Sequence, residues 1–226
     1  MTEQRHTDAG PGSTAVIRAW DELVATARRT VADGLVVGTS GNVSVRVAGT
    51  VLVTPSGVPY DELTPADVLG VGLDGARLFG TLTPTSELPM HLAIYRATDA
   101  RAVVHTHAVH ATAVSTLVPE LPAVHYMTAA LGGTVRVAPY ALYGTDELAE
   151  NMLHALRDRN ACLLQNHGTV VHGDTLAQAF ERTAQLEWMC RLWLTATSVP
   201  GHTPHILSAA QVRETGEKLK GYGQRS

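Results

Sequence analysis

The sequence predicts an α/β fold, in which a single domain of three layers has helices on both faces of a mostly antiparallel central β-sheet. Segments with helical periodicity alternate along the chain with short runs of β-branched residues, and this alternation is typical of a layered α/β domain. The chain has 226 residues, 45% of them hydrophobic and 17% charged, so it can form one sizeable core. No repeat or linker composition divides residues 1–226, and we expect one domain.

The first half of the chain predicts two helices and two hairpins. After a flexible tail at residues 1–12, Ser13 or Thr14 can cap a helix that ends at Gly34. Its apolar stripe is expected to comprise Ile17, Trp20, Val24, Ala27 and Val31. The elements expected next are strands at 43–47 and 51–53, a short helical turn at Thr64-Pro65, a hairpin turning at Asp74-Gly75, and a helix within 83–95 that Thr85 or Ser86 caps.

The second half begins with a short buried strand around Val103 and Val104, which runs into His105-Thr-His107. A helix is expected from about His110. The remaining expected elements are extended pieces at 122–126 and 135–139, a helix from 145 to about 157, strands at 161–164 and 170–171, a helix from 175 to about 196, a last helix from 208, and a mobile tail at 221–226.

Composition excludes several classes of function. A formal net charge of −4 and a pI near 6.2 provide no basic surface for nucleic acid or for an anionic membrane. No stretch approaches the ~20 apolar residues of a membrane span, and the polar first dozen residues do not resemble a signal peptide. Cys162 and Cys190 lie in apolar segments and are interpreted as buried free thiols. We therefore expect a cytoplasmic protein.

Four residues form a candidate metal site. His105 and His107 are two apart on one strand, so their side chains point to the same face. Glu87 and His91 are four apart on one helix face, and only one of them is needed to extend the site. His167 follows another apolar strand. Taken singly, such histidines also serve as strand caps or core residues, but Glu87, His105, His107 and His167 together supply three nitrogens and one oxygen, a set that suits Zn²⁺.

Three turns of small residues form a candidate anion site. Gly41-Asn42, Ser56-Gly57 and Thr85-Ser86 combine side-chain hydroxyls or an amide with accessible backbone N–H groups. Such groups bind phosphate without a lysine. Ordinary turn chemistry explains any one of these turns by itself. Because Thr85-Ser86 adjoins Glu87, an anion bound there would lie beside the metal.

Seven segments have the pattern of a known family when they are taken together. They are Thr39-Ser-Gly-Asn-Val-Ser-Val-Arg46, Thr54-Pro-Ser-Gly-Val-Pro-Tyr60, Ser86-Glu87, Val104-His-Thr-His-Ala-Val-His110, Val124-His-Tyr-Met127, Ala138-Pro-Tyr140 and Gln165-Asn-His-Gly168. On these segments the chain resembles the class II aldolase/adducin family, most strongly its members that act on L-fuculose 1-phosphate. The resemblance extends over nearly the whole chain and implies a class II aldolase-like fold.

The resemblance also implies an activity. Family members of this kind cleave a ketose 1-phosphate reversibly to dihydroxyacetone phosphate and an aldehyde such as L-lactaldehyde. One Zn²⁺ per subunit would be held by Glu87, His105, His107 and His167, with Glu87 also acting as the acid/base. The phosphate cradle would consist of Gly41, Asn42, Ser56, Gly57, Thr85 and Ser86. Tyr126 would be a catalytic tyrosine, and Tyr222 would join it from the C-terminal tail, in a homotetramer whose active sites lie at subunit boundaries.

The sequence departs from the family pattern at three positions, and it leaves rival functions open. Thr85 stands where serine is usual, and Tyr143 and Leu219 stand where phenylalanines are expected near the aldehyde. An L-ribulose-5-phosphate 4-epimerase is expected to carry Asp at the position of Glu87. A methylthioribulose-1-phosphate dehydratase is a further alternative. An adducin-like binding module would share the fold but lack the zinc ligands.

Overall fold

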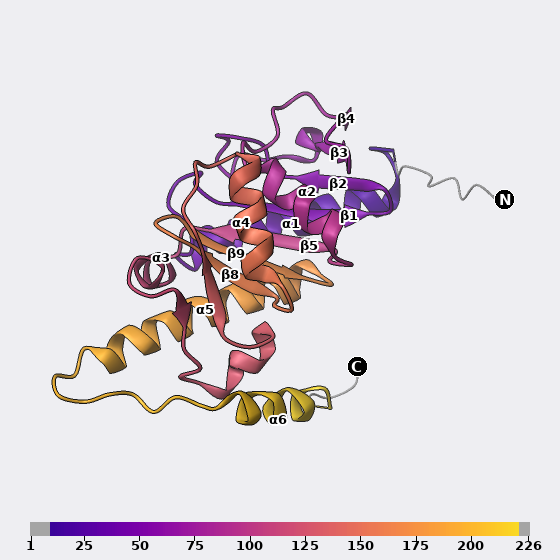
Figure 1. The fold of residues 1–226 in the computed structure, drawn as a ribbon. Coiled ribbons are helices and arrows are strands. Elements are labelled where there is room, and N and C mark those ends of the chain that lie inside the picture. The colour runs from indigo at the N-terminus through magenta and orange to yellow at the C-terminus, as the bar shows by residue number, and fades with distance from the viewer. Residues whose placement is uncertain (1–9, 222–226) are drawn as a thin grey trace.

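One β-sheet passes through the middle of the molecule, and helices cover both of its faces (Figure 1). The computed structural model describes residues 10–221, and within them the strand order is β4-β3-β2-β1-β5-β9-β8-β7-β6. The strands are β1 (Asn42–Val47), β2 (Thr50–Val53), β3 (Gly70–Gly72), β4 (Arg77–Phe79), β5 (Ala102–Thr106), β6 (Glu120–Leu121), β7 (Val135–Ala138), β8 (Ala161–Leu164) and β9 (Gly168–Gly173). Among these described strands only β7 and β8 pair in parallel, so the predicted fold class is confirmed with a mixed sheet.

The helices that cover the sheet form two layers, one on each face. The described helices are α1 (Thr14–Ala32), η1 (Pro65–Asp67), α2 (Leu88–Ala97), α3 (Val109–Ser115), η2 (Tyr126–Leu131), α4 (Asp146–Leu156), α5 (Leu176–Thr197) and α6 (Ala209–Leu219), where η denotes a 3-10 helix. The helices α2 and α4 pack on one face of the sheet. The opposite face is covered by α1, α3 and α5. Each layer therefore buries one side of the same central strands.

The central strand β5 shows how the sequence assigns side chains to the two faces. Val103 packs among residues of α2 and α4. Ala102 and Val104 pack instead against α1 and the start of α5. Because side chains alternate along a strand, His105 lies on the face of Val103, which is the face that α2 covers. The strand thereby delivers a histidine beneath the first turn of α2.

Helix α1 begins where its cap predicts, but its buried stripe differs from the predicted one. The Ser13 hydroxyl accepts a hydrogen bond from the N–H of Val16 at 3.2 Å. Ile17 and Val31, which were expected in the stripe, are 47% and 44% exposed. Val16, Leu23 and Thr30 are buried in their place, together with the predicted Trp20, Val24 and Ala27. The buried face of α1 is thus rotated by about one residue from the predicted face. The apolar periodicity of the sequence did not distinguish the two faces.

Helix α2 starts later than predicted, so the assignment of Thr85 or Ser86 as its cap is wrong. Its N-cap is Glu87, and no described side chain caps it. The Thr85 hydroxyl accepts instead from the N–H of Glu87 at 3.3 Å, and the Thr85 N–H donates to the carbonyl of Thr54 at 3.1 Å. These bonds keep residue 85 beside the end of β2, and the helix cannot begin before Leu88.

The segment at 122–126 is also not the extended piece that was predicted. Pairing in this region is limited to β6, two residues long, and Tyr126 opens the 3-10 helix η2. The prolines at 119 and 122 flank β6, and proline lacks the N–H that a longer ladder would need. Tyr126 is consequently placed on a helical turn, where its side chain is 52% exposed.

The C-terminal part of the described chain forms an arm. Helix α5 continues past the sheet layers, residues 198–208 run back as an irregular stretch, and α6 lies alongside η2 (Figure 1). The N–H of Leu207 donates to the carbonyl of Ala123 at 3.0 Å, which ties this stretch to the body. Cys162 and Cys190 are buried free thiols, as predicted. Within residues 10–221, no helix combines the length and hydropathy that a bilayer crossing requires.

Candidate metal centre and substrate pocket

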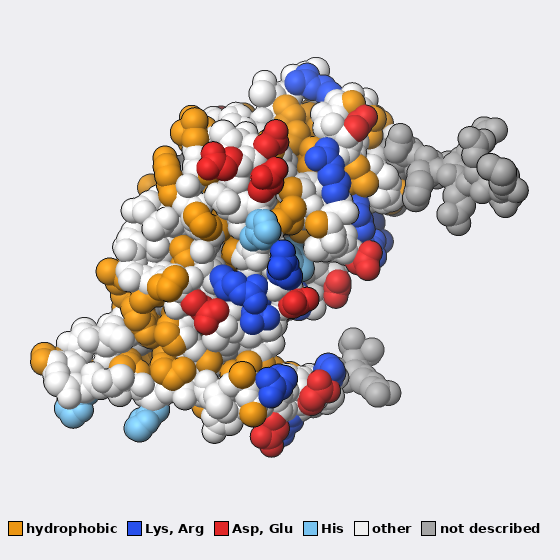
Figure 2. Space-filling view, in the orientation of Figure 1, with side chains coloured by type: hydrophobic (Ala, Val, Ile, Leu, Met, Phe, Trp, Pro, Cys, Tyr) orange, Lys and Arg blue, Asp and Glu red, His pale blue; other side chains and the backbone are white. Residues whose placement is uncertain are grey.

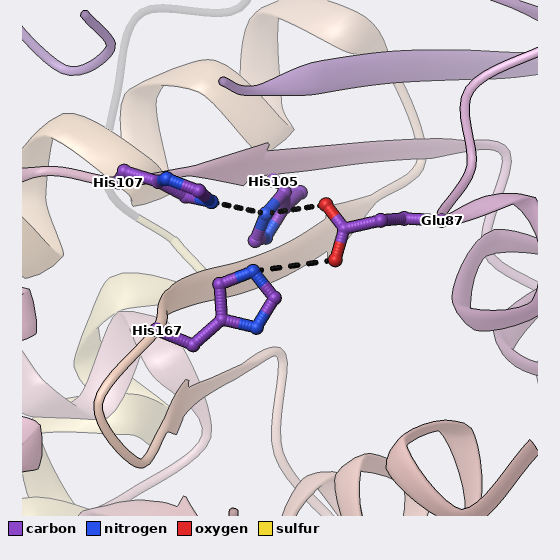
Figure 3. A group of neighbouring side chains, drawn as sticks. All are labelled: Glu87, His105, His107 and His167. Atoms are coloured by element: carbon purple, nitrogen blue, oxygen red, sulfur yellow. Dashed lines mark hydrogen bonds and ion pairs between the residues drawn. The ribbon is translucent and has the colours of Figure 1, made fainter. Parts of the chain in front are cut away.

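Four elements bring the predicted metal ligands together, as Figure 3 shows. His105 lies near the end of β5, and His107 follows that strand by one residue. His167 lies in the turn between β8 and β9, and Glu87 immediately precedes α2. One ligand atom from each of the four residues lies within 4.8 Å of the others. Sequence segments up to 80 positions apart therefore converge on one point.

The distances in this cluster are those of atoms that share a common partner. Nε2 of His105 lies 2.9 Å from Oε2 of Glu87 and 3.0 Å from Nε2 of His107. Nε2 of His167 lies 3.2 Å from Oε1 of Glu87. The three imidazole rings are nearly perpendicular to one another, with every pair of ring centroids 4.9 Å apart. The rings thus aim nitrogen atoms, not ring faces, at the same place.

Proton counting shows whether these residues suit a cation. Nδ1 of His105 is 2.8 Å from the carbonyl oxygen of Thr169, which can only accept, so Nδ1 carries the ring proton. In a neutral ring Nε2 then presents a lone pair to the Glu87 carboxylate. Oε1 of Glu87 is itself buried without a hydrogen bond from any described residue. A divalent cation would serve all these acceptors at once, so the residues present fit a metal ion.

The electrostatics of the site agree with this donor set. Burial, together with repulsion from His105, lowers the pKa of both His107 and His167 to about 4. Both rings are therefore neutral near pH 7 and keep a lone pair for a metal. Burial by itself raises the pKa of Glu87, but the pull of His105 and His167 outweighs it and holds that pKa well below its usual range. An ionised carboxylate at Glu87 and neutral rings at His107 and His167 suit a divalent cation.

Two glycines permit the close packing of backbone that this convergence needs. A Cβ at Gly168 would collide with the carbonyl of Thr106 on the neighbouring strand. A Cβ at Gly41 would lie 2.8 Å from the carbonyl oxygen of His105 and would also meet Val36. Only glycine fits these positions without a shift of the backbone. The turn that carries His167 and the loop before β1 can therefore approach β5.

The three predicted anion-binding turns meet beside the cluster. Residues 54–56 and 83–85 are bridged by two backbone bonds, Ser56 N–H to the Thr83 carbonyl at 2.9 Å and Thr85 N–H to the Thr54 carbonyl at 3.1 Å. The N–H groups of Gly57 and Ser86 donate to no acceptor within residues 10–221. Gly57 has a φ of +71°, a conformation that favours glycine. Two donors thus remain for an anion, one of them at Ser86, the residue before Glu87.

One cavity of about 370 Å³ joins the two predicted sites. Its walls include all six residues of the predicted cradle, which are Gly41, Asn42, Ser56, Gly57, Thr85 and Ser86. They also include Glu87, His107 and His167. Among the described residues that line it, none is lysine or arginine, so an anion there would depend on hydroxyl and N–H donors. The arrangement can hold a small anionic molecule against the metal ligands.

The tyrosines divide between this cavity and the surface beyond it. Tyr143 lines the cavity, and so does Tyr140, the last residue of the segment Ala138-Pro-Tyr140. Tyr126 is not among the described residues that line it, and Leu219 lines a separate hollow between α6 and α5. Tyr222 lies outside the described residues. Within this chain, therefore, the structure does not bring Tyr126 to the metal ligands.

Sequence reasoning did not identify the roles of two further residues. His91 is fully buried and does not join the metal ligands, because its ring contacts Asn42 and Ser44 instead. Glu187 of α5 accepts hydrogen bonds at the start of α3, directly after the strand that carries the metal ligands. No local pattern identifies these contacts, since Glu187 lies 77 positions from His110.

Comparisons with known proteins agree with this arrangement. Residues 21–194 match the model of the family described as class II aldolase and adducin N-terminal domain. The chain is 43% identical to an L-fuculose phosphate aldolase of Escherichia coli (strain K12), over 85% of this chain and 89% of that protein. It is 36% identical to a 5-methylthioribulose-1-phosphate/5-deoxyribulose-1-phosphate aldolase of Escherichia coli O45:K1, over 92% and 97%. The solved structure of an L-fuculose 1-phosphate aldolase superposes with a TM-score of 0.87 at 34% identity, covering 92% of this chain and 98% of that one.

Proposed function

Since the chain belongs to the class II aldolase and adducin family and is a class II aldolase, a lyase, we propose that it uses zinc to cleave a ketose 1-phosphate reversibly to dihydroxyacetone phosphate and an aldehyde. One observation carries the proposal. A single cavity holds both the Glu–His cluster and three turns of small residues that offer donors to a phosphate. An adducin-like binding module would have no use for that combination.

The donor set favours zinc among the divalent metals that this enzyme class uses. Three imidazole nitrogens and one carboxylate oxygen are typical zinc ligands, whereas magnesium and calcium prefer oxygen. When bound, the metal supplies Lewis-acid stabilisation of the negative charge that develops on the ketose carbonyl oxygen. The protein supplies the neutral imidazoles of His107 and His167 that make such binding possible near pH 7.

Glu87 would move the proton at carbon. In the cleavage direction the hydroxyl at C4 loses its proton, the bond between C3 and C4 breaks, and the aldehyde leaves. The electron pair stays on C3 of the phosphorylated fragment. C3 then takes a proton from Glu87, whose carboxylate acquires that proton from solvent, while the proton of the C4 hydroxyl is released to solvent. Glu87 lines the same cavity as Gly57 and Ser86. Tyr126 of a neighbouring subunit would take the proton from the C4 hydroxyl.

The apolar surface of the arm supports a homotetramer with active sites at subunit boundaries. Tyr126 is 52% exposed and packs against the ring of His125, with centroids 4.4 Å apart. Figure 2 shows hydrophobic side chains gathered along the side of the body that faces the arm. Trp188, Val199 and Ile206 are exposed on α5 and the stretch after it. A second chain seated there would cover these residues and could receive Tyr126 at its own cavity.

A coupled assay for dihydroxyacetone phosphate tests the reaction. The purified protein is offered L-fuculose 1-phosphate, 5-deoxyribulose 1-phosphate and 5-methylthioribulose 1-phosphate, and its zinc is measured in parallel. We expect release from at least one of them by protein that holds about one zinc per chain. Epimerisation of L-ribulose 5-phosphate, or water loss from methylthioribulose 1-phosphate, without any release of dihydroxyacetone phosphate would overturn the proposal.

A second substrate class is favoured by one comparison. The relative at 36% identity acts on 5-methylthioribulose 1-phosphate and 5-deoxyribulose 1-phosphate, which share the phosphorylated end of the ketose but differ in the aldehyde released. In this chain Tyr143 lines the cavity where a phenylalanine is expected. The ratio of kcat/KM values across the three ketoses, measured for wild type and Tyr143→Phe, decides which aldehyde the pocket prefers. A cytoplasmic location stays a prediction.

A further inference from the structure

A row of buried polar side chains leads from Glu87 into the core. It begins with Asn42 and Ser44 on β1 and continues with His91 and Tyr95 on α2. All four residues are buried, and His91 and Ser44 have no exposed surface. Apart from Asn42, none of them lines the cavity. Asn42 belongs to the predicted phosphate cradle, but neither the metal nor the proposed reaction accounts for Ser44, His91 and Tyr95 in the core.

The four side chains form one continuous chain of hydrogen bonds that ends on Glu87. Nδ2 of Asn42 donates to Oε2 of Glu87 at 3.0 Å. Oδ1 of the same amide is 2.5 Å from Nε2 of His91. Nδ1 of His91 is 2.6 Å from the Ser44 hydroxyl, which is 2.7 Å from the Tyr95 hydroxyl. Every polar atom in this row has a partner, in contrast to Oε1 of Glu87 on the other side.

The carboxylate determines the direction of every bond in the chain. Because an ionised carboxylate only accepts, Asn42 must turn its NH₂ group toward Glu87 and its carbonyl oxygen toward His91. His91 must then donate from Nε2, which leaves Nδ1 as an acceptor for the Ser44 hydroxyl. Ser44 in turn accepts from the hydroxyl of Tyr95. All donors therefore point toward Glu87.

The protonation states of His91 and Tyr95 agree with this direction of the hydrogen bonds. Burial lowers the pKa of His91 to about 3, so the ring is neutral and can both donate and accept. Burial raises the pKa of Tyr95 above its ordinary value, so the hydroxyl keeps its proton and serves as the first donor. Hydrogen bonds that point in one direction through a dry interior reinforce one another.

We propose that His91 is a positioning residue of the metal centre, which acts through Asn42 to orient the Glu87 carboxylate. If His91 did not donate to Oδ1, that oxygen would be left buried without a donor, and the amide of Asn42 would shift to find one, which weakens its bond to Oε2. Glu87 would then be free to leave the geometry that serves the metal. Residues that hydrogen-bond to a metal ligand in this way tune both the metal affinity of the site and the basicity of the ligand. The inference rests on the proposed metal site.

The decisive comparison is between His91→Leu and His91→Gln. Leucine fills the space but cannot donate, whereas the amide nitrogen of glutamine can occupy the place of Nε2 and donate to Asn42. The dissociation constant for Zn²⁺ is measured by competition with a chromogenic chelator, and kcat is measured on the zinc-loaded proteins. We expect His91→Leu to bind Zn²⁺ about 10- to 100-fold more weakly, with a lower kcat, and His91→Gln to recover most of both.

Two further variants separate positioning from packing. His172→Leu is a matched control, because that ring also donates from Nε2, to the carbonyl of Arg159 at 3.1 Å, but lies outside the row. It should keep wild-type Zn²⁺ affinity. Ser44→Ala removes the donor to Nδ1 of His91 with little change of volume, and it should weaken Zn²⁺ binding in the same direction as His91→Leu. Ser44→Ala decides the question if His91→Leu does not fold.

The outcomes distinguish this inference from the function on which it rests. Wild-type Zn²⁺ affinity in His91→Leu overturns the inference, as does an equal loss in His91→Leu and His91→Gln, which would indicate packing. A loss in His172→Leu as large as in His91→Leu has the same meaning. A wild-type protein that binds no Zn²⁺ overturns the metal centre itself, and the inference with it.

Discussion

The molecule contains two pairs of glutamate and histidine that look alike and differ in their protons. Glu187 of α5 accepts from the N–H and from Nδ1 of His110, at 3.0 and 2.6 Å, and from the N–H of Ala111 at 2.8 Å. Each of its oxygens therefore faces a donor. Glu87 directly precedes α2, yet its side chain does not cap that helix, and its Oε2 lies 2.9 Å from Nε2 of His105. One carboxylate is satisfied by the protein, and the other is not.

This difference shows how a functional pair can be distinguished from a structural one. Proximity does not separate them, because both carboxylates lie within 3 Å of an imidazole nitrogen. The number of hydrogen-bond donors that each carboxylate receives separates the two pairs. Glu187 completes the first turn of α3 and holds it behind the strand that carries the metal ligands, whereas Glu87 leaves Oε1 without a donor from any described residue. An unsatisfied buried carboxylate beside neutral imidazoles calls for a ligand.

The strongest test of this contrast removes one histidine from each pair. His107→Ala deletes a predicted metal ligand, so we expect the zinc content to fall from about one per chain toward zero and turnover to be lost with it. His110→Ala should retain both, because its ring serves only Glu187. Metal analysis and the aldolase assay check the two variants side by side. Equal zinc in wild type and His107→Ala would refute the ligand assignment.

A second test exchanges each carboxylate for its neutral isostere. Glu87→Gln removes the base that moves the proton at carbon, and turnover should fall by about 10²–10⁴. Glu187→Gln should instead lower the free energy of unfolding by roughly 1–3 kcal/mol, since a buried donor is left without its acceptor, with little effect on the chemistry. Zinc is measured in both variants. Near-normal turnover of zinc-loaded Glu87→Gln would leave Glu87 a ligand only.

Tyr126 extends the comparison beyond a single chain. Its side chain is half exposed and is not among the described residues that line the cavity beside the metal ligands. Tyr126→Phe should therefore barely change the midpoint of thermal unfolding. If its hydroxyl transfers a proton in a neighbouring subunit, the barrier should rise by about 3–5 kcal/mol. Turnover and thermal unfolding of the same preparation check this. Unchanged turnover would make Tyr126 a surface residue.

The sharing of sites is tested with two inactive variants. Tyr126→Phe and His107→Ala are refolded together, so that some sites in the hybrids combine an intact metal cluster with an intact tyrosine. Activity should partly return. Each variant refolded by itself is the control, and hybrids that form but stay inactive would mean that each site is complete within one chain.

The phosphate turns should show a smaller effect of a different kind. Ser56→Ala and Ser86→Ala each remove a hydroxyl from the cavity wall, and a hydrogen bond to a charged group is worth roughly 1.5–3 kcal/mol. We expect KM for the ketose phosphate to rise more than kcat changes. Because Ser86 adjoins Glu87, its kcat is expected to fall slightly as well. Steady-state kinetics decide the point, and an unaltered KM in both variants would place the phosphate elsewhere.

The smallest expected effect is a dependence of stability on pH. The fold lowers the pKa of His107 and His167 from an ordinary value of 6.5 to about 4. Between these values the unfolded chain binds more protons than the folded one, so the metal-free protein should lose stability as the pH falls from about 6.5 to about 4. Denaturant titrations across this range measure the slope. His107→Ala should have a shallower slope than wild type.

Much of the fold could be predicted because its signals are local. Ser13, Thr145 and Ser208 each cap the helix that follows them, and the strand at 161–164 was placed to the residue. Failures occurred where a distant partner overrides the local pattern. Thr85 is held beside β2 by the carbonyl of Thr54, and the short pairing around β6 is limited by its flanking prolines. A local pattern carries no information about such partners.

The sequence by itself determined which residues could carry the chemistry, because residue type and strand period are properties of short segments. It placed His105 and His107 on one face and identified Glu87 and His167 as their companions. Only the tertiary structure decided how those groups share protons. Asn42 reaches Glu87 across 45 positions, and His105 reaches the carbonyl of Thr169 across 64. Hydrogen-bond direction depends on both partners, and these partners meet only when the sheet has formed.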